Sequence, residues 1–225
     1  MKKSLFLILA SLSLTLYSCS GGGSDGSSGG SSDASGIRLV HGALSTSPAI
    51  FEQFKGESDL VYLGKPAFNQ ATGFKDIGTG TKTYQIYPTL SPNKLIRENI
   101  DIQKSARSTI FLFGSEEIGT LQALKLEDTR KILTPGEIGF RIVNGVARNV
   151  AVELRLNDGA PVRVEYGAAS IYQYLTTQSF KIFVKDLSTR DVYVSRTVTL
   201  NPNLHYSLFL TGEKDIFVTD LIVED

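Results

Sequence analysis

Hydrophobic and polar residues alternate with a period of two along one stretch of the chain. From Val150 to Leu156 every second residue is Val or Leu, and alanine, glutamate and arginine lie between them. Successive side chains of a β-strand point to opposite faces, so this pattern predicts a strand with one buried face. Asn157-Asp158-Gly159 follows, and the alternation restarts at Val162, Val164 and Tyr166. Because Asp-Gly tolerates positive φ, these residues predict a hairpin turn.

Similar short apolar runs recur through the chain, and no amphipathic helical pattern of useful length accompanies them. They predict further strands at Lys82–Tyr87, Leu95–Ile102, Ser108–Gly114, Thr120–Leu126, Phe180–Lys185, Val192–Leu200, Leu204–Thr211 and Ile216–Val223. Lys55-Gly56-Glu57 predicts another turn. Short strands with closely spaced turn signals are typical of Ig-like sandwiches. We therefore predict an all-β fold with two tandem Ig-like β-sandwich domains.

The folded part of the chain contains an internal repeat. Three pairs of segments correspond, namely Ile37–Gly42 with Phe140–Gly145, Ser108–Gly114 with Tyr206–Gly212, and Leu124–Asp128 with Leu221–Asp225. The spacing between partners drifts only slightly, as small insertions in loops would cause, and Pro135-Gly136 is a breaker pair between the copies. We predict one sandwich module at residues 37–128 and a second at 138–225.

The N-terminus has the pattern of an export signal. Lys2 and Lys3 precede an apolar run of 13 residues from Leu5 to Tyr17, which is too short to span a bilayer as a helix. Ser18 supplies a small residue before a cut, as signal peptides require. A conventional secretory signal cut elsewhere, or an unprocessed N-terminal helix, stays open as an alternative.

Leu16-Tyr17-Ser18-Cys19 resembles the processing site of bacterial lipoproteins, although Tyr17 is larger than the residue usual at its position. The resemblance implies a signal peptide at residues 1–18, lipid attachment at Cys19 through two or three acyl chains such as palmitate, and a membrane as partner. Two chains give stable anchoring, whereas one is marginal. Ser20 resembles the signal for the outer membrane.

The segment after Cys19 predicts a flexible tether. Residues 19–36 consist of the cysteine and a Gly/Ser-rich run whose largest apolar residue is alanine, so nothing offsets the entropy of ordering it. A Gly/Ser coil of this length spans roughly 23 Å. We expect the modules to stand clear of the membrane.

Composition excludes several classes of function. Removing Lys2 and Lys3 with the signal leaves 21 basic and 23 acidic residues, a net charge of −2, and no basic stripe for nucleic acid. Cys19 is the only cysteine, so neither an intramolecular disulfide nor a Cys-based metal site can form.

The sequence carries few candidates for chemistry. His41 and His205 have no partner at metal-ligand spacing, so we predict hydrogen-bonded structural roles for both. Because Asn144 stands where His41 does in the other copy, a role shared by both copies must be hydrogen bonding. For the acidic loops at Glu116-Glu117 and Glu213-Lys214-Asp215, we favour solvated turns over a Ca²⁺ site.

No motif of a hydrolase, phosphate-binding loop or EF-hand is present in the sequence. We predict no enzyme activity, no cofactor and no metal, although a site assembled from distant residues stays open. Tyr172 and Tyr174 are two residues apart and therefore share one face of a strand. They are the candidate ligand-binding residues, because tyrosine is favoured at binding surfaces, while packing at an edge is the alternative.

Ile37–Gly42, Gly80–Ile86 and Ala123–Asp128 are similar to the family catalogued as domain of unknown function 4397. In the second copy Tyr166–Ser170 and Tyr174–Thr176 resemble the central segment of that family, and the resemblance covers nearly all of 37–225. It implies an Ig-like fold in the cell envelope and no particular activity.

We therefore expect a non-catalytic envelope lipoprotein that binds or scaffolds another envelope protein or a glycan. A surface adhesin is one alternative, and a hydrolase with a site between the modules is another.

Overall fold

The computed structural model describes the chain in six segments, with only the backbone described beyond residue 212. These segments are residues 35–44, 48–55, 59–90, 96–128, 131–213 and 216–224. They form seventeen strands and no helix, which confirms the all-β prediction. Within these segments the structure has no helix of the length and apolarity needed to cross a membrane.

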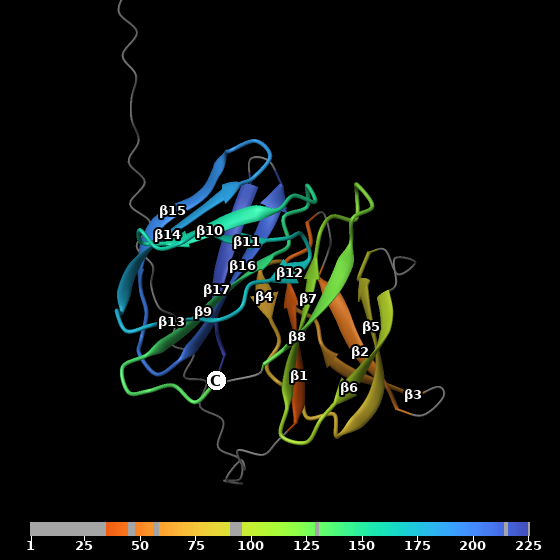
Figure 1. Cartoon of the computed structure of the whole chain (residues 1–225). Coiled ribbons are helices and arrows are strands. Elements are labelled where there is room, and N and C mark those ends of the chain that lie inside the picture. The colour runs from red at the N-terminus through yellow and green to blue at the C-terminus, as the bar shows by residue number, and fades with distance from the viewer. Residues whose placement is uncertain are drawn as a thin grey trace, which may run out of the picture. The chain divides into compact units, whose positions relative to one another are not determined.

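Two four-stranded sheets are built from the first half of the chain (Figure 1). The first has the order β4-β1-β7-β8, with β4 at Gln70–Ala71, β1 at Gly36–His41, β7 at Arg107–Phe113 and β8 at Gln122–Glu127. The second has the order β3-β2-β5-β6, with β3 at Asp59–Gly64, β2 at Ala49–Lys55, β5 at Gly80–Pro88 and β6 at Ile96–Ile102. β1 pairs with β7 in parallel, and the other neighbours are antiparallel.

The second half of the chain repeats this arrangement. One sheet has the order β12-β9-β16-β17, with β12 at Ala168–Ala169, β9 at Ile138–Asn144, β16 at His205–Glu213 and β17 at Ile216–Glu224. The other has the order β11-β10-β14-β15, with β11 at Val162–Val164, β10 at Val152–Leu156, β14 at Ser179–Asp186 and β15 at Val192–Thr199. β9 pairs in parallel with β16, and β13 at Gln173–Leu175 adds to β9.

Local sequence explains these strands. In β10 the side chains of Val152, Leu154 and Leu156 are buried while the residues between them are not, as the period of two predicts. Asn157 takes a φ of 50°, and Gly159 N–H donates to the Leu156 carbonyl at 3.0 Å, which closes the predicted turn. β11 ends at Val164, however, so Tyr166 does not continue the alternation.

Each pair of sheets encloses its own hydrophobic core. The first core includes Ile37, Phe51 and Ile86, and the second includes Phe140, Leu154 and Phe180. These cores confirm the sandwich packing. The strand order differs from the immunoglobulin constant domain, where the first strand lies beside the second, because here β1 lies beside β7.

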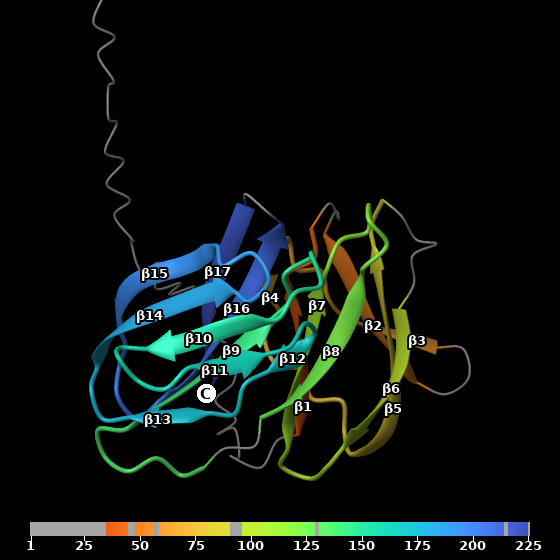
Figure 2. The ribbon, with the colours of Figure 1, turned by 45° about the horizontal axis from the view of Figure 1, so that its top comes forward.

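Four central strands are buried on both of their faces. β1, β7 and β9 are buried or nearly so at every position, as is β16 as far as Gly212. One face of each strand lines its own sandwich, and the other lies against the other half of the chain (Figure 2). Residues 31–225 accordingly form one compact unit. Separate domains at 37–128 and 138–225 stay a prediction.

Several predictions fall outside the described residues. These are the signal peptide at residues 1–18, Cys19 with most of the tether, the turn at Gly56-Glu57, and the side chains of the Glu213-Lys214-Asp215 loop.

Candidate functional site

The two candidate tyrosines lie together beside the start of β16. The ring centroids of Tyr172 and Tyr174 are 6.3 Å apart. Both rings meet the imidazole of His205 edge-on, with centroids at 5.2 and 6.3 Å. A Cβ at residue 139 would overlap the imidazole, so Gly139 of β9 makes the room that His205 occupies. The two rings are neighbours, although only Tyr174 lies in a strand, because β13 begins at Gln173.

Each tyrosine of this cluster lies under a cation. The Arg141 guanidinium carbon is 4.7 Å from the centroid of Tyr172, and Lys131 Nζ is 4.2 Å from that of Tyr174. Lys131 also pairs with Glu137 at 3.0 Å. The Thr134 N–H and the Lys131 ammonium hold the pKa of Glu137 below its usual range. We call Tyr172, Tyr174, His205, Lys131 and Arg141 the aromatic–cationic cluster.

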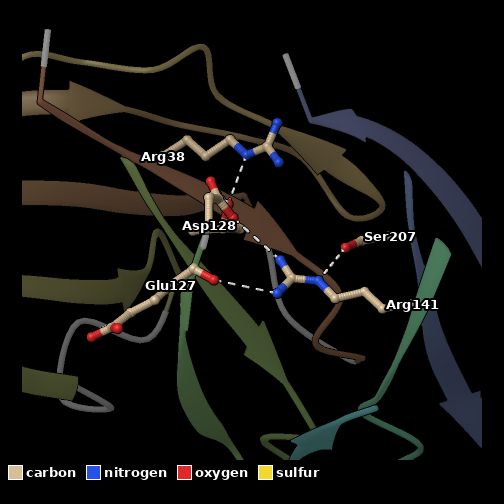
Figure 3. A network of polar contacts seen from close by, with 6 residues as sticks. Arg38, Glu127, Asp128, Arg141 and Ser207 are labelled. Carbon is tan, nitrogen blue, oxygen red and sulfur yellow. Dashed lines mark hydrogen bonds and ion pairs between the residues drawn. The ribbon is translucent and has the colours of Figure 1, made fainter. Parts of the chain in front are cut away.

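Arg141 links this cluster to the first half of the chain (Figure 3). Its Nη2 lies 3.2 Å from Asp128 Oδ1, and both side chains are almost fully buried. Its Nε donates to Ser207 Oγ at 2.6 Å, and Nη1 donates to the backbone carbonyl of Glu127 at 3.4 Å. The guanidinium fork therefore binds one carboxylate and two neutral oxygens at once.

A matching arginine lies on the other side of this network. Arg38 Nε donates to Thr109 Oγ1 at 2.9 Å, and that hydroxyl lies 3.5 Å from Asp128 Oδ2 (Figure 3). Arg38 and Arg141 occupy the same position in the two copies of the repeat, as do Thr109 and Ser207. Asp128 thus sits between equivalent elements of the two halves.

The remainder of the junction between the halves is apolar. Val40, Phe111, Phe113 and Leu126 of the first half pack against Val143 and Phe209 of the second. Phe111 and Phe209 meet with centroids 4.7 Å apart. Tyr166 packs edge-on against Phe113, and its hydroxyl donates to the Thr120 carbonyl at 3.1 Å. Tyr166 therefore serves the junction, which explains why it leaves the strand pattern.

Two glycines allow this close packing. A Cβ at Gly145 would lie 2.6 Å from Phe111 Cε1 and 2.7 Å from Phe113 Cβ. A Cβ at Gly42, the equivalent residue of the first half, would overlap Thr211. Neither glycine has a positive φ, so both positions require a small side chain for space rather than for backbone freedom.

A polar cavity of about 370 Å³ opens beside the network, between β6 and β8. Its lining includes Asp101, Lys104, Arg107 and Lys125 as well as Asp128. Cations and carboxylates alternate there, which suits a small polar ligand better than an apolar one. All lining residues belong to the first half of the chain, so this cavity is not a cleft between the modules.

His41 and Asn144 have the same local role. His41 is fully buried, and its Nδ1 accepts the N–H of Ala43 at 3.3 Å. Asn144 Oδ1 accepts the N–H of Val146 at 3.3 Å, and its amide donates to two further carbonyls. Hydrogen bonding is therefore the role that His41 and Asn144 share, as predicted, whereas the contacts shown for the His205 ring are those with Tyr172 and Tyr174. Within the described segments, no three His, Cys, Asp or Glu side chains gather as metal ligands would.

No family model matches the chain, and no curated protein matches it. The resemblance to domain of unknown function 4397 therefore stays a prediction. Among solved structures, the chain is similar to a "putative cell adhesion protein" from Bacteroides uniformis ATCC 8492. The two are 7% identical with a TM-score of 0.28, over 85% of this chain and 97% of that one. A similarity this low carries no conclusion about function.

Sequence reasoning found the tyrosines of the aromatic–cationic cluster but not Arg141, Asp128 or Phe111. The repeat does carry a sign of the junction, because both copies have arginine at one equivalent position (Arg38 and Arg141) and glycine at another (Gly42 and Gly145). Equal positions indicate a shared structural demand. They do not reveal that the demand comes from the facing half of the chain.

Proposed function

We propose that this chain is a lipid-anchored, non-catalytic protein of the bacterial cell envelope that binds or scaffolds another envelope component. The sequence pattern up to Cys19 supports the anchor, and Ser20 supports the outer membrane. The Gly/Ser run that follows supports a tether that lets the folded part move relative to the membrane.

The packed junction is the observation that carries this proposal. Phe111, Phe113 and Phe209 are at most 1% exposed, and a buried ion pair adjoins them. Such a junction holds the two sandwiches as one body and keeps their outer surfaces in a fixed relation, as a scaffold requires. A hydrolase with a site between the modules would need open space where these rings lie.

The aromatic–cationic cluster is a candidate contact surface for the partner. Tyr174 is 36% exposed and Lys131 is half exposed, and Ile171, which precedes Tyr172 in the chain, is 81% exposed. Tyrosine, which combines an apolar ring with a polar tip, is favoured at binding surfaces. A partner that covers Tyr174 would meet a ring already oriented by Lys131 and His205.

Cross-linking of the full chain in envelope extract, followed by capture and mass spectrometry, tests the proposal. We expect a specific partner whose recovery falls with Tyr174→Ala. It should persist with Val192→Ala, which removes an exposed apolar side chain of β15. Recovery of no specific protein by the unaltered chain would overturn the binding of a protein partner.

Protease treatment of intact cells decides which side of the membrane the modules face. Cleavage would place them outside and would convert the proposal into that of a surface adhesin. Protection, together with cleavage after the outer membrane is opened, would place them in the periplasm.

A further inference from the structure

The outer face of the sheet β3-β2-β5-β6 carries an ordered row of polar and aromatic side chains. Glu52 of β2 lies opposite Tyr62 of β3 on one side and opposite Gln85 of β5 on the other. Gln85 in turn lies opposite Arg97 of β6. The neighbouring residues Phe51 and Ile86 belong to the core. Because successive side chains alternate between faces, the row points away from the core.

Hydrogen bonds join three members of this row, Glu52, Gln85 and Arg97. The Gln85 amide donates to Glu52 Oε2 at 2.7 Å, and Arg97 Nη2 donates to Gln85 Oε1 at 3.3 Å. The Tyr87 hydroxyl donates to the same Glu52 oxygen at 3.3 Å. A carboxylate and a guanidinium have more acceptors and donors than these bonds use. The row is therefore pre-oriented and still able to bind hydroxyl groups.

Aromatic and aliphatic surface flanks the polar groups. Tyr62 is 60% exposed at the edge strand, and Leu60 of the same strand is 46% exposed. The Arg97 guanidinium carbon lies 4.4 Å from the Phe54 ring centroid, so this side chain lies flat across the sheet. A second polar pair, Thr83 with Asn99, continues the face at 2.8 Å. The face thus alternates ring surface with fixed hydrogen-bonding groups.

Charge within the row is balanced, and Asp101 of β6 lies further along the same face. The row contains one carboxylate, Glu52, and one guanidinium, Arg97, which are joined through Gln85. The outer face of the sheet β11-β10-β14-β15 differs, because ion pairs such as Lys185–Glu153 cover it. A balanced row matches an uncharged partner, and the further carboxylate of Asp101 disfavours an anionic one.

We infer that the outer face of the sheet β3-β2-β5-β6 binds a neutral glycan chain. A sugar ring offers a C–H face that stacks on tyrosine and a rim of hydroxyl groups that suit carboxylate and guanidinium partners. Four strands place the row over three spacings of about 4.8 Å, or roughly 14 Å, which is long enough for a few sugar rings. This inference rests on the proposed binding role and assigns it a surface and a ligand class.

Affinity electrophoresis of the full chain in detergent, through gels containing neutral polysaccharides (dextran, galactomannan and xyloglucan), tests the inference. We expect at least one polymer to retard the chain, and Tyr62→Ala to weaken binding about tenfold. Tyr62→Phe should retain most of the affinity, because it keeps the ring. Arg163→Ala, which removes an exposed cation of the other outer face, is the matched control and should change nothing.

Three results would overturn the inference. They are no retardation by any of the neutral polymers, equal loss with Arg163→Ala, or retardation by anionic heparin alone. If one of these results is found but cross-linking recovers a protein partner that depends on Tyr174, the proposed function stands while the glycan inference fails. If retardation occurs but cross-linking recovers no protein, the partner is the glycan itself.

Discussion

Replacing Asp128 by alanine should destabilise the folded chain by about 3–5 kcal/mol, because it removes the carboxylate that pairs with the buried Arg141 guanidinium. The Asp128 side chain is 0% exposed and that of Arg141 is 6% exposed, with 3.2 Å between Oδ1 and Nη2. After the substitution Arg141 loses this carboxylate, whereas its hydrogen bonds to Ser207 and to the Glu127 carbonyl are to neutral oxygens. The guanidinium cannot lose its proton, so its charge stays buried after the carboxylate at 3.2 Å has gone.

The neighbouring residue provides a matched control for this prediction. Glu127→Ala also removes one carboxylate, but that side chain is 66% exposed and pairs with Lys125 near the surface. Its loss should cost under about 1 kcal/mol. Arg141→Met combined with Asp128→Ala should recover much of the stability, since both members of this buried ion pair are then removed.

Urea unfolding of the full chain in detergent measures these differences in the free energy of unfolding. Because the chain contains no tryptophan, far-UV circular dichroism monitors the transition. For a chain of this size, the loss at Asp128 corresponds to a fall in melting temperature of about 6–20 °C. A loss below about 1 kcal/mol for Asp128→Ala, or equal losses for Asp128→Ala and Glu127→Ala, would refute the reasoning.

Three further predictions concern the junction, a turn and the anchor. Gly145→Ala should lower the free energy of unfolding by about 1–3 kcal/mol, because the added Cβ overpacks against Phe111, and urea unfolding measures this loss. Gly73→Ala should be nearly neutral, because a Cβ added there would meet no atom beyond its chain neighbours within 4 Å. Burial alone would raise the pKa of Asp186, but hydrogen bonds from Ser188, Tyr193 and Thr189 lower it to about 2. The carboxylate therefore stabilises the fold above about pH 4, and the benefit, up to about 2 kcal/mol, is lost as the pH falls from 4 towards 2. Unfolding across that range should show a shallower acid loss for Asp186→Asn, and an unchanged slope would contradict this. Cys19→Ala should give a folded protein that no longer fractionates with membranes, and its retention there would show that another part holds it.

Local pattern was sufficient to predict most strands and turns. The alternation over β10 and the Asn157-Asp158-Gly159 turn are features of neighbouring residues, so the sequence alone reveals them. Strand ends shifted by a residue or two, as with β8, which begins at Gln122 rather than Thr120. Short-range chemistry decides such elements, and distant residues only adjust their ends.

The junction was not predicted, although the sequence carries a trace of it. Ile110–Phe113 is an unbroken apolar run, which is typical of a strand covered on both faces. Ile110 and Leu112 point into the first core, while Phe111 and Phe113 point towards the second half. The run indicates a second buried face but not its partner, because that depends on how two distant sheets meet.

The repeat itself explains why the junction forms between these two faces. Val40 lies opposite Phe111 in β1 and β7, and Val143 lies opposite Phe209 in β9 and β16. Both pairs occupy equal positions in the repeat, and the two phenylalanines meet directly. Equivalent patches that contact one another form the interface of a two-fold dimer. A module whose outer face is self-complementary, once duplicated in one chain, would bury that face against its own copy. The outer faces of the other sheet in each half differ from one another. Ion pairs lie on β10 and β14, whereas β2 and β5 carry the row that contains Glu52 and Gln85. This difference, beside the similarity at the junction, fits the proposed scaffold with one binding face.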